Sequence, residues 1–292
     1  MQYDITLRIE YEYASAATFG RHLLRLMPLN LPGEQRLVSG LLTALPDPDE
    51  RIDRLDFFGN TCTEVGHDAP HKALAFHIAA RVERLAQPGP VGLATPLAAL
   101  MDDVQAVLSL DADAPHHYLP ASARIGPDPA RAAYARALLR SGMSTRDAVE
   151  EIGRALYRDM TFDSKATTVE TPPEEAFARR VGVCQDFSQI MIGALRDVGI
   201  PAGYVSGFLR TEPPPGQPRL AGADAMHAWV RAWCGGDAGW VEFDPTNDVF
   251  VGTDHVVVAR GRDYADALPV RGVLRAFGRP ATSQAVDMIP LP

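Results

Sequence analysis

The first residues of the chain alternate between apolar and polar side chains. Apolar or aromatic residues stand at every second position from Tyr3 to Tyr13, and polar or charged residues occupy the positions between them. This period of two predicts a long β-strand with one buried face. Similar segments, separated by turns rich in Pro, Gly, Asn and Asp, lie at 23–27, 37–45, 54–65 and 73–82. Residues 1–86 are therefore predicted to form an antiparallel β domain, comparable to a small sandwich.

The pattern changes after Gln87-Pro88-Gly89-Pro90, where Pro and Gly interrupt the strand periodicity. The following sequence is rich in Ala and Leu and predicts a short helix at 96–108 and a helix that begins at Pro129. A third helix is predicted after Ser144, which has the spacing of a capping box with Asp147. We therefore expect a helical linker that opens the core at 87–160, followed by the main core and a C-terminal tail at 161–292.

Cys184 stands at the predicted start of a strongly amphipathic helix. Apolar residues recur at helical spacing from Phe187 to Val198, and Gly199 followed by Pro201 ends the helix. A thiol at this position lies beside unpaired N–H groups and the positive end of the helix dipole, which both favour the thiolate. Cys184 is therefore the candidate nucleophile, although the ordinary role of a cysteine is that of a small buried residue.

Strands are predicted after this helix at 202–209, 226–233 and 239–243, with a last strand at 255–259 and an irregular tail beyond it. A hairpin loop at 234–237 would pair Trp229 with Glu242 and His227 with Asp244. This register places the imidazole and the carboxylate on one face, within hydrogen-bonding distance. A carboxylate that holds one nitrogen of an imidazole leaves the other nitrogen free to act on a thiol. Cys184, His227 and Asp244 are thus the predicted nucleophile, base and orienting acid.

The charge and composition of the chain restrict its partners. Its 292 residues include 28 Lys and Arg against 37 Asp and Glu, for a net charge of −9, and no basic block stands out. This argues against a nucleic-acid partner. The N-terminus lacks the basic and apolar regions of a signal peptide, and no apolar run reaches the length of a membrane span. Because the three cysteines also suggest no disulfide framework, we expect a cytoplasmic protein without a membrane partner.

A zinc site is the main competing interpretation of the cysteines and histidines. Cys62, His67, His71 and His77 offer suitable ligands, but their spacing matches no compact pattern of ligand pairs. The sequence also contains no P-loop and no dinucleotide-binding fingerprint. We therefore expect neither a metal nor a cofactor.

The remaining histidines have no partner nearby in the sequence. His116, His117 and His255 are therefore assigned to loops or to the surface, and Cys234, in a glycine-rich turn, is assigned no function.

Short blocks along the chain resemble the transglutaminase-like superfamily, and within it the bacterial transglutaminase-like cysteine proteases that have an N-terminal β domain. The blocks are Thr167-Thr168-Val169 with Thr171-Pro172, Gly182–Phe187, His227–Val230, Asp244–Asn247 and Gly261–Tyr264, together with Phe58-Gly59-Asn60 in the N-terminal domain. The resemblance implies an α+β protein, in which the sandwich-like domain precedes a papain-like core with the cysteine helix packed on an antiparallel sheet. It also matches Cys184 to the nucleophile, His227 to the base and Asp244 to the acid.

Three residues are candidates for contact with the substrate. They are Gln185, Tyr204 and Trp229. Arg231 departs from the family pattern, which often has an acidic residue after the His-Ala-Trp-Val block, and so puts the substrate contacts there in doubt.

The implied reaction is attack of the Cys184 thiolate on an amide carbonyl to form a thioester. The backbone N–H of Cys184 is one candidate oxyanion donor. Resolution by water would make the protein a hydrolase of peptides or proteins, whereas resolution by an amine would make it a protein-glutamine amine acyltransferase. A catalytically inert, peptide-binding scaffold of the same fold is the alternative from another class. The proline-rich loop at 211–224 is a candidate lid over the site.

Overall fold

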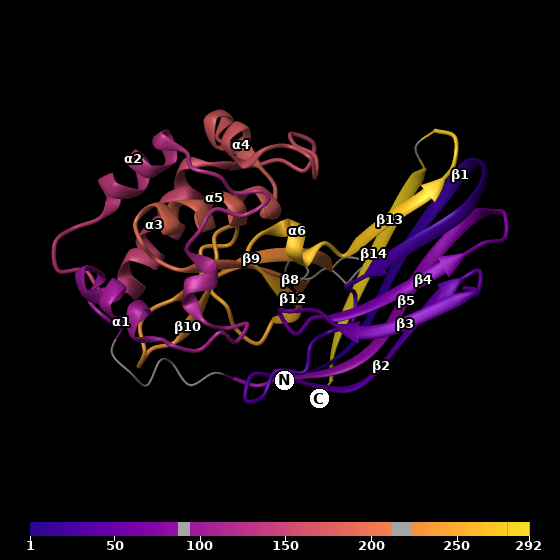
Figure 1. Cartoon of the computed structure of the whole chain (residues 1–292), viewed down its shortest axis with the longest axis horizontal. Coiled ribbons are helices and arrows are strands. Elements are labelled where there is room, and N and C mark those ends of the chain that lie inside the picture. The colour runs from indigo at the N-terminus through magenta and orange to yellow at the C-terminus, as the bar shows by residue number, and fades with distance from the viewer. Residues whose placement is uncertain (87–93, 212–223, 279, 292) are drawn as a thin grey trace, which may run out of the picture.

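The structure, a computed structural model, describes residues 1–86, 94–211, 224–278 and 280–291. Figure 1 shows the helices gathered on one side and the long strands on the other, with both chain ends close together at the base of the strands. The predicted interruption at 87–90 and residues 212–223 of the predicted lid at 211–224 lie outside the described residues.

A single long strand organises the N-terminal region. β1 (Gln2–Leu24) continues well beyond the predicted 3–13 strand. Its first part pairs with β5 (His71–Arg84) and β14 (Ala281–Leu291), and its last part pairs with β4 (Thr61–His67) and β13 (Val270–Arg275). β2 (Gln35–Leu45) pairs with β5, and β3 (Glu50–Leu55) pairs with β4. β1 thus belongs to both layers of a sandwich-like domain, which agrees with the predicted architecture.

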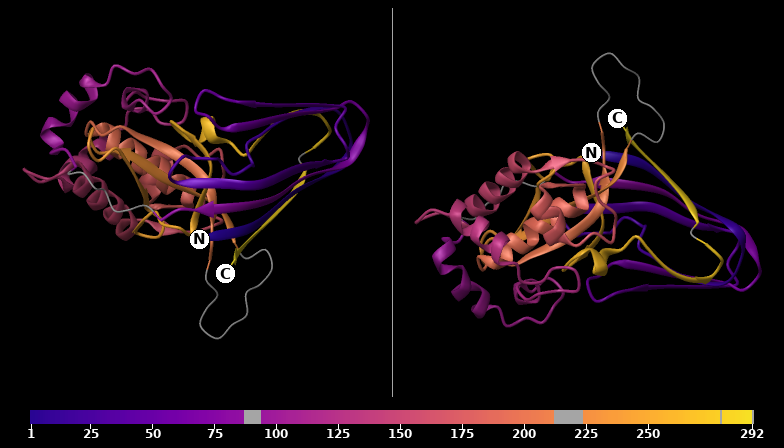
Figure 2. Two further views of the ribbon diagram at one scale, coloured as in Figure 1. Left: turned by 90° about the horizontal axis from the view of Figure 1, so that it is seen from below. Right: turned by 90° about the horizontal axis from the view of Figure 1, so that it is seen from above.

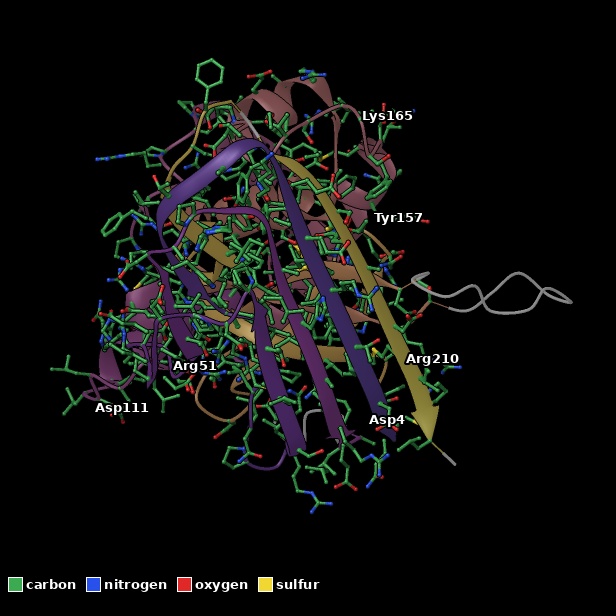
Figure 3. The ribbon with its side chains drawn as sticks, turned by 90° about the vertical axis from the view of Figure 1, so that its right-hand side faces the viewer. Asp4, Arg51, Asp111, Tyr157, Lys165 and Arg210 are labelled. Carbon is green, nitrogen blue, oxygen red and sulfur yellow. The ribbon has the colours of Figure 1, made fainter. Side chains whose placement is uncertain are left out.

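Three sequence predictions for strands of this domain are wrong. The segment 23–27 is not a strand of its own, because Leu23 and Leu24 are the last residues of β1 and residues 25–27 lie beyond its end. The segment 54–65 is not one strand, because a turn divides it, in which the Asp56 side chain accepts hydrogen bonds from the backbone of Phe58 and Asn60. The expected irregular tail instead forms β13 and β14, which return to pair with β1 (Figure 3). Val286 and Met288 of β14 are buried in the N-terminal core. The predicted third segment, 161–292, therefore ends on the sheet that opens the chain.

The helices begin and end largely where the local signals predict. Asp128 accepts hydrogen bonds from the backbone of Ala130 and Arg131, and Ser144 accepts one from Asp147. Gly199, with φ of 85°, follows the cysteine helix as predicted. The helices are η1 (Leu97–Ala99), α1 (Leu100–Ala106), η2 (Pro115–Tyr118), α2 (Pro129–Leu138), α3 (Thr145–Asp159), α4 (Pro173–Arg179), α5 (Cys184–Asp197) and α6 (Tyr264–Ala267), and the short strands β6 (Thr161–Phe162) and β7 (Val181–Gly182) pair in parallel before α5.

An antiparallel sheet supports α5. Its strands follow the order β11 (Val249–Phe250), β10 (Trp240–Asp244), β9 (Ala225–Trp233), β8 (Ala202–Leu209) and β12 (His255–Gly261). Alternate residues of β9 share a buried cluster with α5, whereas Trp229 and Val257 pack with Leu29 from the N-terminal region. The sheet therefore lies between α5 and the N-terminal region, and Figure 2 shows the long strands extending away from it.

In the part of the chain that the structure describes, no helix has both the length and the apolar character needed to cross a membrane.

Candidate active site

The hairpin of β9 and β10 has a register different from the predicted one. Trp233 pairs with Trp240 and Val230 with Phe243, so the prediction is wrong by two residues. The loop extends to Gly239, whose N–H donates to the Gly235 carbonyl at 2.8 Å, and both glycines have positive φ. Side chains alternate between the faces of a strand with a period of two, so a shift of two keeps His227 and Asp244 on one face.

Asp244 is fully buried, with an exposed fraction of 0%, and every hydrogen bond to its carboxylate comes from N–H groups. Oδ2 accepts from His227 Nε2 at 2.7 Å and from Asn247 Nδ2 at 2.7 Å. Oδ1 accepts from the backbone N–H of Thr246 at 2.9 Å and of Asn247 at 3.3 Å. Burial raises the pKa of Asp244, but the hydrogen bonds from His227 and His255 outweigh it and hold the pKa well below its ordinary value. The predicted proximity of His227 and Asp244 is confirmed.

His227 connects this carboxylate to the thiol. Its side chain is almost buried, at 8% exposed. Burial lowers the pKa of His227, but hydrogen bonds to Asp244 and Cys184 outweigh burial and raise the pKa to about 10. Because Nε2 is held by Asp244, Nδ1 is the ring nitrogen that remains for the thiol of Cys184.

Cys184 is half-buried and is the first residue of α5. Its N–H is one of the first four of the helix, which have no partner within the helix. The neighbouring carboxylate of Asp186 accepts hydrogen bonds from the Val183 N–H at 2.8 Å and from Thr167 Oγ1 at 2.6 Å. Burial raises the pKa of Asp186. The Thr167 block of the sequence thus anchors a loop at the start of the cysteine helix.

The other two cysteines have the environment of inert thiols. All three cysteines are free, but Cys62 and Cys234 are buried. Burial raises the pKa of the Cys62 thiol and raises the pKa of the Cys234 thiol to about 12. A thiol held in its protonated form is a poor nucleophile. Cys184 is therefore the most accessible of the three thiols.

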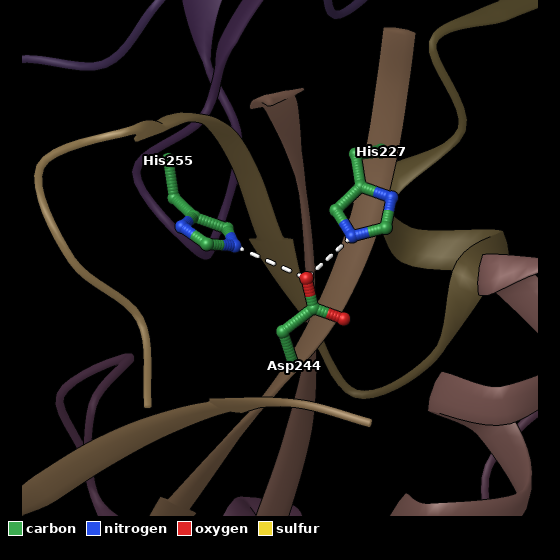
Figure 4. Close-up of side chains that lie close together, drawn as sticks. All are labelled: His227, Asp244 and His255. Atoms are coloured by element: carbon green, nitrogen blue, oxygen red, sulfur yellow. Dashed lines mark hydrogen bonds and ion pairs between the residues drawn. The ribbon is translucent and has the colours of Figure 1, made fainter. Parts of the chain in front are cut away.

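The assignment of His255 to a loop or to the surface is wrong. Only 4% of His255 is exposed, and its Nε2 donates to Asp244 Oδ2 at 3.1 Å, the oxygen that also accepts from His227 (Figure 4). The strand of His255, β12, is separated from β10 by β8 and β9, so no local pairing signal could have predicted the contact. Among the described residues, His227, Asp244 and His255 are the one group of three potential metal ligands whose ligand atoms all lie within 4.8 Å of one another.

All three candidates for substrate contact are buried. Gln185, beside the thiol, donates from Nε2 to the Val169 carbonyl at 3.3 Å. Tyr204 is buried next to Tyr264, with ring centroids 5.8 Å apart. Trp229 has an exposed fraction of 0% and donates from Nε1 to Glu242 Oε2 at 2.8 Å. The hydrogen bond to Glu242 thus holds the Trp229 ring within the fold.

Arg231, the departure from the family pattern, is also buried. Its Nη1 donates to Asp113 Oδ1 at 2.7 Å, and its guanidinium lies 4.0 Å from the ring centroid of Trp240. Its charge is therefore already paired within the fold.

Comparison with known proteins agrees with this geometry. Residues 132–245 match the family model of the transglutaminase-like superfamily, and residues 3–83 match that of the bacterial transglutaminase-like N-terminal region. An uncharacterized protein of Mycobacterium tuberculosis is 34% identical over 99% of this chain and 93% of its own length. An uncharacterized protein of Mycobacterium leprae is 30% identical over 92% of this chain and 91% of its own length. The chain belongs to the transglutaminase-like superfamily.

A solved structure, described as a "putative cysteine protease" from Cytophaga hutchinsonii, is similar over the whole chain. It covers 100% of this chain and 91% of its own, with a TM-score of 0.76 and 21% identity. The predicted combination of an N-terminal β domain and a transglutaminase-like core is therefore confirmed.

Proposed function

We propose that the protein is a cysteine hydrolase that cleaves amide bonds of peptides or proteins, with Cys184, His227 and Asp244 as its catalytic triad. The observation that carries the proposal is the buried hydrogen bond from His227 Nε2 to Asp244 Oδ2, combined with the interaction of His227 with Cys184. Membership of the transglutaminase-like superfamily supports an enzyme of this chemistry.

In the proposed reaction, His227 takes the thiol proton of Cys184, and the sulfur attacks the amide carbonyl carbon. As the C–N bond breaks, His227 gives the proton to the leaving amine, and a thioester remains on Cys184. A water molecule, deprotonated by His227, then attacks the thioester, which releases the acid and restores the thiol. The N–H of Cys184 is the proposed donor to the oxyanion, because it stands at the free end of α5.

Labelling by an electrophilic thiol probe tests the proposed nucleophile. Native protein is expected to react with iodoacetamide at Cys184, and Cys184→Ala is expected to keep its fold, checked by circular dichroism, and to lose the label. Labelling that remains at Cys62 or Cys234 of the folded Cys184→Ala variant would contradict the proposal.

The second half-reaction is tested by its product. Incubation with a glutamine-containing peptide and a labelled amine yields cleaved peptide or peptide-bound glutamate for a hydrolase and an amine-linked peptide for an acyltransferase. Mass spectrometry of Cys184 after exposure to a cell extract would identify the acyl group, and hence the substrate. A protein that labels at Cys184 but never forms an acyl adduct would instead fit the inert peptide-binding scaffold.

We further propose a peptide or protein as the partner and the cytoplasm as the location. The free state of all three cysteines supports a reducing compartment. Gln185 is proposed as the first substrate contact because it directly follows the nucleophile in the chain; its exposed fraction is 7%, against 0% for Trp229.

A further inference from the structure

Asp244 receives two imidazoles on the same oxygen. His227 Nε2 lies 2.7 Å from Oδ2 and His255 Nε2 lies 3.1 Å from it (Figure 4). The proposed triad of nucleophile, base and orienting acid contains one imidazole, that of His227. His255 is therefore a buried ionisable group in direct contact with the proposed triad to which the proposed reaction gives no role.

We propose that His255 is a positioning residue of this site, which holds the carboxylate of Asp244 in place for His227. The inference rests on the proposed function and adds a fourth residue to it. His255 does not contact the thiol or the substrate. It acts through Asp244, because each further N–H that Oδ2 accepts, here that of His255 beside those of His227 and Asn247, fixes the carboxylate in orientation and keeps it ionised.

The imidazole of His255 is itself held from one side by Trp229. The two rings pack edge to face, with centroids 5.1 Å apart, and Trp229 Nε1 donates to Glu242 Oε2 at 2.8 Å. Arg260 Nη2 donates to the other oxygen of Glu242 at 2.7 Å. A buried network thus runs from Arg260 through Trp229 to His255, which gives the ring a defined position.

The N-terminal region holds the chain on both sides of His255, through the side chain of Asp254 and the backbone of Val257. Tyr3 Oη on β1 donates to Asp254 Oδ1 at 2.7 Å. Gln35 accepts from the Val257 N–H at 2.8 Å and donates from Nε2 to the Val257 carbonyl at 2.8 Å. Residues far from the site in sequence therefore fix the start of β12, and through His255 they contribute to the geometry of Asp244.

A metal ion is the competing interpretation of the same cluster. Two imidazoles and one carboxylate can bind a divalent cation, with zinc–nitrogen distances of about 2.0–2.1 Å. Here, however, Oδ2 already accepts three N–H groups, from His227, His255 and Asn247, at hydrogen-bond distances. The amide nitrogen of Asn247 is a donor that a metal would have to displace. The observed geometry is that of a hydrogen-bonded carboxylate.

The test compares two substitutions of His255 in the full chain. His255→Phe keeps a ring against Trp229 and removes the donor. His255→Gln places its Nε2 the same number of bonds from Cα as the imidazole Nε2, and so keeps a donor. The rate constant for alkylation of Cys184 by iodoacetamide at pH 7 is expected to fall about fivefold in His255→Phe. A less firmly held Asp244 gives the protonated imidazole of His227 less support, and a cysteine without such a partner is only a few per cent thiolate at pH 7. His255→Gln is expected to restore most of the rate.

His117→Gln, on a partly exposed histidine outside the site, is the control and should match the wild type. Thermal denaturation checks that each variant folds. Equal rates for wild type and His255→Phe, with Cys184 still reactive, would overturn the inference and leave the proposed function intact. A wild-type protein in which Cys184 is no more reactive than a free thiol would overturn the proposed function itself. Stoichiometric zinc binding that depends on His255, with an unchanged alkylation rate in metal-free His255→Phe, would also overturn the inference, in favour of a metal site.

Discussion

His227 Nε2 lies 2.7 Å from Asp244 Oδ2, although the register of the hairpin does not place these two residues directly opposite each other. The imidazole instead reaches diagonally across one face of β9 and β10, where side chains two positions apart remain within reach. The pair is buried, so its hydrogen bond is not weakened by competition with water. The strength of this hydrogen bond should therefore affect both the reactivity of the Cys184 thiol and the free energy of unfolding of the protein.

Asp244→Asn should slow the alkylation of Cys184 by iodoacetamide. The variant replaces the ionised partner of His227 with a neutral amide, so the protonated imidazole that accompanies a thiolate is less stable. Without this partner the thiol should approach the behaviour of a free cysteine, which is only a few per cent thiolate at pH 7. We therefore expect a loss of roughly 10- to 30-fold in the rate constant. Asp237→Asn, on an exposed carboxylate of the hairpin loop, is the matched control. A rate equal to that of the control would mean that Asp244 does not support the thiol.

The stability of the protein should depend on the ionisation of this pair. The pKa of His227 is raised from 6.5 to about 10, so its stabilising contribution is complete below pH 6.5 and is lost as the pH rises through about 10. The pKa of Asp244 is lowered, so its contribution is present above 3.8 and is lost as the pH falls through the lowered value. Between pH 6.5 and 10, the free energy of unfolding of the wild type should therefore fall more steeply than that of Asp244→Asn. Parallel curves from urea denaturation would contradict this expectation.

Thr167→Val should destabilise the fold at the start of α5. The substitution removes the hydroxyl that donates to Asp186 Oδ2 at 2.6 Å and leaves a buried carboxylate with one fewer donor. We expect a loss of about 1–3 kcal/mol in the free energy of unfolding, measured by urea denaturation. Thr168→Val, next to it on an exposed side chain, should change stability by less than about 0.5 kcal/mol. Equal effects of the two variants would show that the bond to Asp186 contributes nothing.

Gln35→Leu should weaken the attachment of β12 to the N-terminal region. Leucine has a similar size but cannot accept the Val257 N–H, which then stays buried without that partner. We expect a cost of about 1–3 kcal/mol in urea denaturation. Gln105→Leu, on an exposed position of α1, is the control, and the hypothesis fails if both variants unfold at the same urea concentration.

Thiol titration with Ellman's reagent should distinguish the cysteines by depth. In the native protein only Cys184 is expected to react promptly, because burial protects Cys62 and Cys234 and raises the pKa of both thiols. In denaturant all three should react. Prompt reaction of more than one thiol in the native state would contradict the described burial.

The sequence alone determined the parts of this protein that depend on neighbouring residues. Alternation predicted the first half of β1, and the helical repeat after Cys184 predicted α5 and its end at Gly199. The prediction that His227 and Asp244 share one face of the hairpin also holds, because side chains alternate with a period of two and a register error of two residues keeps both on that face.

Only the tertiary structure decided which distant segments meet. The length of the hairpin loop, the return of β14 to β1 and the arrival of His255 at Asp244 all join residues whose local patterns carry no information about each other. Nothing in the local sequence distinguishes His255 from another histidine at the start of a strand. Its contact with Asp244 depends on the position of β12 in the sheet. The physical reason is that periodicity records which face of an element is buried, whereas the partner that buries it is selected by the packing of the whole chain.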